Sequence, residues 1–250
     1  MSTGNCTYIL LGSCFSQHMS QQMAQRNIMH VSNPLGTLFN PESIRIVVSQ
    51  ALKAGNVALP MFHDKDMDEW RCWWANTQFR DTERTVCEAR IRAALDQLGH
   101  SLRSASHLFL TLGTNVCYRL KESGITVTNC QRQADRLFQE YRLSTQEIID
   151  ILEDCINKLH QANPSLKITF TISPYRYRKY GYHGSQLSKA ALLLAVDSIC
   201  SRHAGYVGYF PSYEIMMDEL RDYSYYAPDG LHPSSQASDI IWNRLCEYLQ

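Results

Sequence analysis

Tyr8-Ile9-Leu10-Leu11-Gly12-Ser13-Cys14-Phe15-Ser16 is the stretch of this 250-residue chain that decides its fold. Residues 7–11 form a short, largely apolar run that Gly12 ends, a pattern typical of a strand covered on both faces. The sequence predicts a helix directly after it, over residues 15–26. A buried strand that passes through a tight turn into a helix is the opening of an α/β unit with a parallel sheet.

The same alternation of strand and helix continues along the chain. Further strands are expected at 28–31, 107–112, 167–172 and 206–210. Further helices are expected at 41–53, 82–102, 144–161 and 186–202, with a last one after Pro233. We therefore predict an α/β fold: a three-layer α/β/α sandwich around a five-stranded, doubly wound parallel sheet. We expect one domain over residues 1–250, with an insertion at 55–80 and a hairpin at 117–129.

The amino-acid composition limits which binding partners and which cellular compartment are expected. Lys and Arg (24) balance Asp and Glu (24), which argues against nucleic acid or an anionic membrane as the main partner. Nine cysteines without a C-x-x-C pattern are typical of a reducing compartment, so we expect a cytoplasmic protein. We see no signal peptide and no apolar stretch long enough to span a membrane. The scattered histidines and cysteines indicate no metal site and no cofactor.

Two short motifs at opposite ends of the chain contain side chains that could catalyse a reaction. Ser13 and Cys14 follow the first strand, where the start of a helix favours a thiolate and offers backbone N–H groups to an oxyanion. Asp229 stands three residues before His232, a spacing that lets a carboxylate orient an imidazole. Together they supply a nucleophile, a base and an orienting group. The alternatives are a packed, inert cysteine and an ordinary Asp-Gly surface turn.

Other strand ends add weaker candidates, because the carboxyl ends of parallel strands share one rim. Gly36 could present a backbone N–H group, and Asn115 a side-chain amide, to a developing oxyanion. Arg176 lies in a basic, aromatic loop suited to an anionic or sugar substrate. The alternative interpretations are a turn glycine, an asparagine that closes a turn, and a solvated loop.

The chain resembles the GSCFA family, which is common in Bacteroidetes bacteria and is itself similar to the SGNH/GDSL hydrolases. Gly12-Ser13-Cys14-Phe15-Ser16 matches the motif that names the family, with Ser16 in place of its final Ala. The resemblance covers nearly the whole chain through further matches: Asn33-Pro34-Leu35-Gly36, Thr111-Leu112-Gly113-Thr114, Asn129-Cys130, Ser173-Pro174, Ser188-Lys189, residues 210–223 and His232-Pro233-Ser234.

This resemblance implies an esterase-type or acyl-transfer enzyme. Cys14 takes the place of the SGNH nucleophile, which is normally serine, and Ser13 stands beside it as the alternative. Asp229 and His232 fall on the Asp-x-x-His block. The N–H groups of Cys14 and Gly36 and the side chain of Asn115 fall on the oxyanion positions. The expected substrate is a small-molecule or carbohydrate acyl ester or thioester, either hydrolysed or used for acyl transfer.

The chain also departs from its relatives. Those relatives often carry histidine where this chain has Asn76, Gln131 and Tyr177. If those histidines serve activity, this member is altered or weakened. The second hypothesis is therefore a non-catalytic binding or scaffold module on the same fold.

Overall fold

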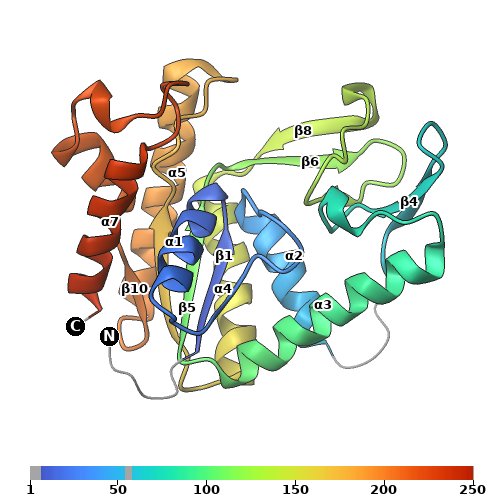
Figure 1. Ribbon diagram of the computed structural model, residues 1–250, viewed down its shortest axis with the longest axis horizontal. Coiled ribbons are helices and arrows are strands. Elements are labelled where there is room, and N and C mark those ends of the chain that lie inside the picture. The colour runs from blue at the N-terminus through green and yellow to red at the C-terminus, as the bar shows by residue number, and fades with distance from the viewer. Residues whose placement is uncertain (1–6, 54–57, 250) are drawn as a thin grey trace.

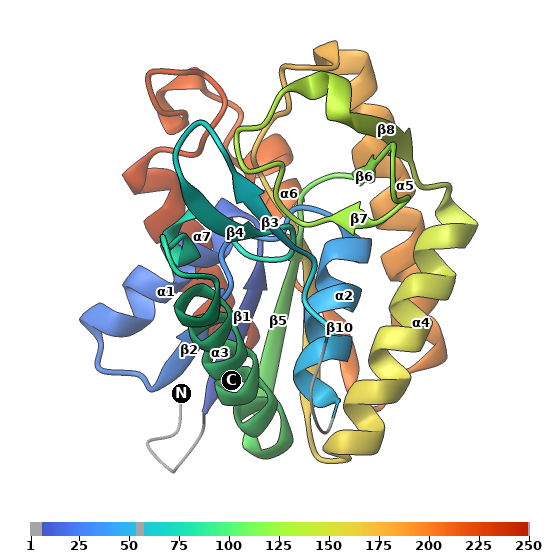
Figure 2. The same cartoon turned by 90° about the vertical axis from the view of Figure 1, so that its right-hand side faces the viewer.

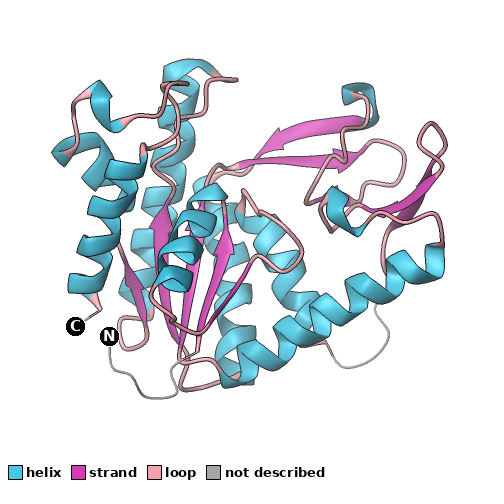
Figure 3. Ribbon diagram, viewed as in Figure 1, coloured by secondary structure: helices cyan, strands magenta, loops and turns pink. Residues whose placement is uncertain are grey.

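The computed structural model describes residues 7–53 and 58–249. A central sheet holds five strands in the order β10-β9-β5-β1-β2, and every neighbouring pair is parallel (Figure 1 and Figure 3). The strands are β1 (Tyr8–Gly12), β2 (His30–Ser32), β5 (His107–Leu112), β9 (Lys167–Ile172) and β10 (Val207–Tyr209). The predicted α/β fold with a five-stranded parallel sheet is confirmed.

Alternate residues of the strands face two separate cores, which makes the sandwich three layers deep. Ile9 and Leu11 belong to the larger core, under the helices α2 (Pro41–Leu52), α3 (Arg84–Ser104), α4 (Thr145–Ala162) and α5 (Gly181–Arg202). Tyr8 and Leu10 belong to the smaller core, under α1 (Cys14–Gln25) and α7 (Ser235–Tyr248). The first strand is therefore apolar on both faces, as its sequence predicts.

Capping residues begin the helices where the sequence places them. Asn40 accepts a hydrogen bond from the Ser43 N–H at 2.8 Å, and Pro41 follows as the first residue of α2. Ser144 and Glu147 form the reciprocal bonds of a capping box at α4. Between β10 and α7 the chain makes only short turns: α6 (Ser212–Glu214), the π-helical turn η3 (Ile215–Glu219) and the 3₁₀ turn η4 (Tyr223–Tyr225).

A second body of strands lies beyond the carboxyl ends of the central sheet (Figure 1 and Figure 2). We call residues 58–79 and 116–142 the cap. The expected insertion at 55–80 contributes the antiparallel hairpin β3 (Met61–Asp64) and β4 (Glu69–Cys72), followed by the turn η1 (Thr77–Phe79); its residues 55–57 lie outside the described residues. The expected hairpin at 117–129 contributes β6 (Val116–Leu120) and β7 (Thr126–Val127). The turn η2 (Asp135–Leu137) and the strand β8 (Phe138–Arg142) complete a three-stranded sheet.

Tryptophans join the two halves of the cap. Trp73 is buried, stacks on Phe62 at 3.8 Å between ring centroids, and meets Phe138 edge-on at 5.6 Å. The indole N–H of Trp74 donates to the Thr126 carbonyl at 3.0 Å. These contacts form a small core of their own, separate from the cores of the sandwich.

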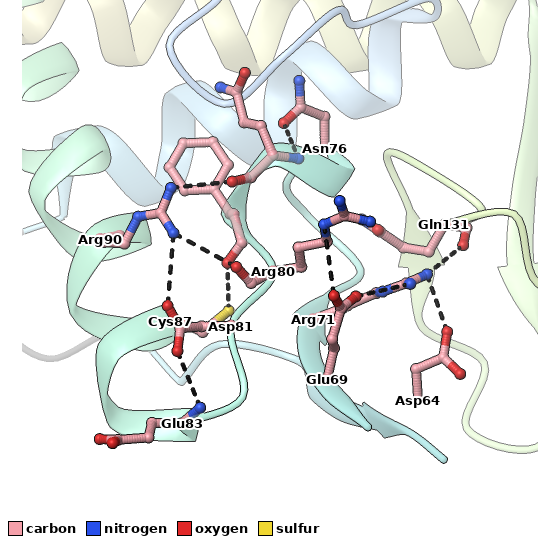
Figure 4. A network of polar contacts seen from close by, with 12 residues as sticks. Asp64, Glu69, Arg71, Asn76, Arg80, Asp81, Glu83, Cys87, Arg90 and Gln131 are labelled. Carbon is pink, nitrogen blue, oxygen red and sulfur yellow. Dashed lines mark hydrogen bonds and ion pairs between the residues drawn. The ribbon is translucent and has the colours of Figure 1, made fainter. Parts of the chain in front are cut away.

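A polar network ties the cap together and fastens it to α3 (Figure 4). The buried guanidinium of Arg71 lies 3.0 Å from Asp64 and 3.1 Å from Glu69, and it donates to the Gln131 carbonyl at 3.0 Å. Arg90 of α3 reaches back to the Gln78 carbonyl at 3.0 Å. Arg71 thus links the hairpin to the segment before β8, and Arg90 links the turn η1 to the sandwich. Among the described helices, none is long and apolar enough to cross a membrane.

Candidate active site

The turn after β1 brings the backbone of Gly12 unusually close to β5. Gly12 has φ +142°, and a Cβ atom there would lie 2.2 Å from the Thr111 carbonyl oxygen. Only glycine fits such an approach between two backbones. Ser13 follows as the N-cap of α1, with its hydroxyl accepting the Phe15 N–H at 3.4 Å. Cys14 is therefore the first residue of the helix, where backbone N–H groups lack intrahelical partners.

The predicted nucleophiles and the predicted base line one cavity of about 190 Å³: Ser13, Cys14 and His232. Gly113 and Ser173, which follow β5 and β9, add backbone to its wall. Three aromatic rings complete the lining, those of Phe39, Tyr175 and Tyr177. Two motifs more than 200 residues apart in the sequence thus meet at the rim where the parallel strands end.

Asp229 holds His232 by hydrogen bonds to both its ring and its backbone. His232 Nδ1 lies 2.5 Å from one carboxylate oxygen, and the other oxygen accepts the N–H groups of Leu231 at 2.8 Å and His232 at 3.0 Å. The backbone N–H and the ring of His232 lower the pKa of Asp229 to about 2. An ionised carboxylate only accepts hydrogen bonds, so Nδ1 carries a proton, and in the neutral imidazole Nε2 then has the free lone pair. This is the tautomer that a general base requires.

Cys14 is half-buried beside this base. Burial raises the pKa of its thiol, and a hydrogen bond from its own backbone N–H offsets only part of that rise. The group is therefore a thiol at neutral pH. No hydrogen bond joins its sulfur to His232 among the described contacts; the two groups share the cavity wall. Catalytic hydrogen bonds of this kind often tighten only when substrate is bound.

A second histidine near the site was missed in the sequence. His18 lies one helical turn after Cys14 on α1, and the pKa of His18 is lowered by burial and by its electrostatic interaction with the ring of His232. The i, i+4 spacing from Cys14 is the signal that could have identified it, because residues four apart share a helix face.

The two other predicted oxyanion donors are engaged elsewhere. The Gly36 N–H donates to the Asn33 carbonyl at 2.8 Å, and the Asn115 side-chain amide donates to the Leu143 carbonyl at 2.8 Å. Neither residue lines the cavity. Cys14 does line it, and its own sulfur is the sole partner of its backbone N–H among the described contacts. The roles of Gly36 and Asn115 stay predictions.

Arg176 also lies outside the cavity lining. Its guanidinium sits over the rings of Tyr182 and Tyr226, at 5.2 and 5.6 Å from their centroids, and its backbone N–H donates to the Leu231 carbonyl at 3.1 Å. It therefore fastens the loop after β9 to the segment that carries His232. Its neighbour Tyr175 makes the closer contact, with 4.3 Å between its ring centroid and that of His232.

A buried lysine lies behind the cavity. Lys189 of α5 is 1% exposed, and its ammonium donates to the Gly113 carbonyl at 2.8 Å and the Ser173 carbonyl at 2.7 Å. Burial lowers the pKa of Lys189 to about 7. Because both carbonyls belong to residues of the cavity wall, this side chain links the ends of β5 and β9.

The three departures from the family pattern lie in different surroundings. Asn76 caps the turn η1 and packs against Gly36, where an added Cβ would come within 2.5 Å of it. Gln131 is buried in the cap and donates to the carbonyls of Cys72 and Ala75. Only Tyr177 lines the cavity. Within the described residues, no group of three His, Cys, Asp or Glu side chains is arranged to hold a metal ion.

Several solved structures resemble this fold. A Streptococcus pneumonia protein, described as a candidate platelet activating factor, has 12% identity and a TM-score of 0.53, over 100% of this chain and 86% of that chain. An acetyl xylan esterase from the rumen bacterium Butyrivibrio proteoclasticus has 11% identity and a TM-score of 0.49, over 100% and 64%. A candidate SGNH hydrolase from Slackia heliotrinireducens has 12% identity and a TM-score of 0.48, over 99% and 100%.

None of the curated proteins matches the sequence. The model of the GSCFA family, by contrast, matches residues 7–245, nearly the whole chain. The motif that carries Cys14 and the segment that carries His232 both fall inside that match, and the protein belongs to the GSCFA family.

Proposed function

We propose that the protein is an esterase-type enzyme that cleaves an acyl ester or thioester, with Cys14 as nucleophile, His232 as base and Asp229 as the group that orients the base. One observation carries this proposal. Cys14 and His232 line the same cavity, and Asp229 holds His232 in the tautomer that leaves Nε2 free to accept a proton.

The reaction follows from these roles. The Cys14 sulfur attacks the carbonyl carbon while His232 Nε2 takes the thiol proton, which gives a tetrahedral oxyanion. The bond to the leaving oxygen or sulfur then breaks, and His232 returns the proton to that atom. An acyl thioester remains on Cys14. Water, losing a proton to His232, attacks this thioester, the carboxylic acid leaves, and the sulfur regains its proton. In an acyltransferase an acceptor alcohol replaces the water.

The oxyanion would be held at the start of α1. The Cys14 N–H lies there, and the partial positive charge of a helix N-terminus favours a developing negative charge. Gly36 and Asn115 would join only after leaving the carbonyls of Asn33 and Leu143. We propose that Arg176 acts in substrate binding through the loop it holds, next to Tyr175 and His232.

Cys14 is a better candidate nucleophile than Ser13. The Ser13 hydroxyl is engaged as the N-cap of α1, and the residue is 3% exposed. Cys14 is less buried, and a thiol is the stronger nucleophile once deprotonated. The two assignments predict opposite results for single substitutions.

Hydrolysis of p-nitrophenyl acetate by wild type, Cys14→Ala, Ser13→Ala and His232→Ala tests the assignment. We expect Cys14→Ala and His232→Ala to abolish turnover and Ser13→Ala to retain it. Mass spectrometry should find an acetyl group on the peptide that carries Cys14 after rapid acid quenching. Full activity in both Cys14→Ala and His232→Ala would overturn the proposal, while loss in Ser13→Ala alone would make Ser13 the nucleophile.

One observation favours a second candidate, a binding module with no catalysis. Burial keeps Cys14 protonated at neutral pH, and no described hydrogen bond links it to His232. Such a module would bind an acyl ester without turnover. Labelling separates the two functions: an enzyme would react with a fluorophosphonate or chloromethyl ketone at Cys14 or Ser13, and a module would not.

A further inference from the structure

A second cavity of about 230 Å³ adjoins the one that holds Cys14. Phe39 and Tyr177 line both cavities, so the two cavities meet at these side chains. The sandwich and the cap each contribute a wall of the second cavity: Phe39 follows β2, while Val127 and Cys130 belong to the cap. A group bound at Cys14 could therefore extend past Phe39 and Tyr177 under the cap.

Three of the polar side chains that line this cavity are already paired with the protein. Asn40 donates to the Val116 carbonyl at 3.1 Å and accepts the Ser43 N–H. The Thr114 hydroxyl lies 3.1 Å from that of Ser188, and the Thr128 hydroxyl donates to the Trp73 carbonyl at 3.4 Å. These groups have little hydrogen-bonding capacity left for a ligand.

Apart from Asn129, whose side-chain oxygen accepts the Gln131 N–H at 2.7 Å, and the cluster of Tyr118, Lys179 and Tyr180, the remaining wall is apolar. Val116 and Val127 are buried, at 2% and 3% exposed, and Phe39 and Cys130 face the same space with the ring of Tyr177. Val116 belongs to none of the three hydrophobic cores of the described residues, and it lines the cavity. An apolar cavity of about 150 Å³ is large enough to hold benzene. This one accommodates a chain or ring of about six carbons.

The charged group at the second cavity is neutralised. Lys179 is 59% exposed, and its ammonium lies 2.9 Å from Glu140 and 2.6 Å from the Tyr118 hydroxyl. The Tyr180 hydroxyl donates to the same carboxylate at 3.0 Å. An anionic ligand would have to compete with Glu140 for Lys179, so the second cavity favours a neutral group.

The position of His232 shows which half of the substrate extends this way. The leaving group must lie beside His232, because that residue returns the proton to it. Neither His232 nor its ring neighbour Tyr175 lines the second cavity. The ring of Tyr175 contacts His232 on one side and Tyr177 on the other, with 5.1 Å between the two tyrosine centroids, and Tyr177 lines the second cavity. The arm that passes Tyr177 therefore leads away from the leaving group and belongs to the acyl half.

We propose that the second cavity is an acyl-binding subsite that selects esters or thioesters with an apolar acyl group of about six carbons over acetyl esters. This inference rests on the proposed function of Cys14 and His232 and adds its substrate class. Each methylene buried there is worth up to about a fourfold gain in kcat/KM.

Paired substrates test the subsite. We expect wild type to cleave p-nitrophenyl hexanoate with at least tenfold higher kcat/KM than p-nitrophenyl acetate. Val116→Phe fills the cavity and should reduce that ratio to near one, while Val116→Ala should preserve the preference for hexanoate. Val86→Phe, at an exposed position of α3, is the matched control and should keep the wild-type ratio. Thermal melts establish that each variant is folded.

Esters that differ in the alcohol, rather than in the acyl group, provide the result that would overturn the inference. Hydrolysis of methyl acetate and hexyl acetate, monitored through the acid that it releases, measures selection in the alcohol half. A preference for hexyl acetate that Val116→Phe removes, with no preference between the p-nitrophenyl esters, would place the alcohol in this cavity. Equal losses for both p-nitrophenyl esters in Val116→Phe would also refute the subsite.

A binding measurement separates the subsite from the proposed chemistry. Calorimetric titration of Cys14→Ala with hexanoate and with acetate requires no turnover. Hexanoate binding that Val116→Phe weakens at least tenfold supports the subsite even if no ester is cleaved, in which case only the catalytic proposal fails. Equal binding of hexanoate and acetate would overturn the subsite.

Discussion

The buried ammonium of Lys189 should make the stability of this protein depend on pH in an unusual direction. In the folded protein burial lowers the pKa of Lys189 from 10.5 to about 7. Between these two values the unfolded chain binds a proton that the folded chain does not. The free energy of unfolding therefore rises with pH across this window.

The size of this stability change follows from the pKa shift of Lys189. At the folded pKa the native state holds half a proton and the unfolded state a full one, and one unit higher the difference approaches a whole proton. Since a full proton corresponds to about 1.4 kcal/mol per pH unit, Lys189 contributes about 2 kcal/mol of added stability between roughly pH 7 and pH 9. The two carbonyl bonds of its ammonium favour the charged form and oppose the effect of burial.

Urea unfolding of wild type and Lys189→Met at several pH values isolates this contribution, because the other titrating groups are common to both proteins. The difference between the two free energies of unfolding should move in favour of wild type by about 2 kcal/mol from roughly pH 7 to pH 9. Lys121→Met, which removes an exposed lysine, is the control. A difference that stays constant over this range would show that Lys189 remains charged in the fold, and would refute the reasoning.

Three further predictions concern the site and the cap. Iodoacetamide should alkylate Cys14 slowly near pH 7 and faster only at alkaline pH, because burial raises the pKa of the thiol; rapid alkylation near neutrality, detected by peptide mass spectrometry, would contradict this. Gly12→Ala should prevent stable folding, since the added Cβ meets the Thr111 carbonyl at 2.2 Å; a melting temperature equal to that of wild type would exclude this clash. Trp73→Ala should destabilise the cap by about 3–5 kcal/mol and expose it to limited proteolysis. First cleavage outside residues 58–79 and 116–142 would contradict this prediction.

The sandwich was predictable from the sequence because its signals are local. The strands β5 and β9 span the predicted residues 107–112 and 167–172, since each is an apolar run bounded by turn residues. The capping box at Ser144 fixes the start of α4. β8 was not predicted. Its residues Phe138–Arg142 are mostly exposed and form a strand only because β6 lies beside them.

In the candidate site too, contacts between residues close in sequence were predictable, and contacts between distant residues were not. Asp229 and His232 are three residues apart, so their hydrogen bond is a local property that the sequence shows. The orientation of Asn115 depends on the Leu143 carbonyl, which is 28 residues away in the chain. No pattern around Asn115 reveals that partner. The role of Lys189 likewise depends on two distant carbonyls that only the assembled sheet brings together.

The chain order of the cap has a consequence for how this family can diversify. Cys14 and His232 lie near the two ends of the chain, whereas the cap is built from two stretches between them, 58–79 and 116–142. The proposed reacting groups thus lie outside the cap, whereas the cap supplies half of the residues that line the second cavity. Exchange of these two stretches between family members should alter substrate preference as a unit, while the reacting groups keep their positions.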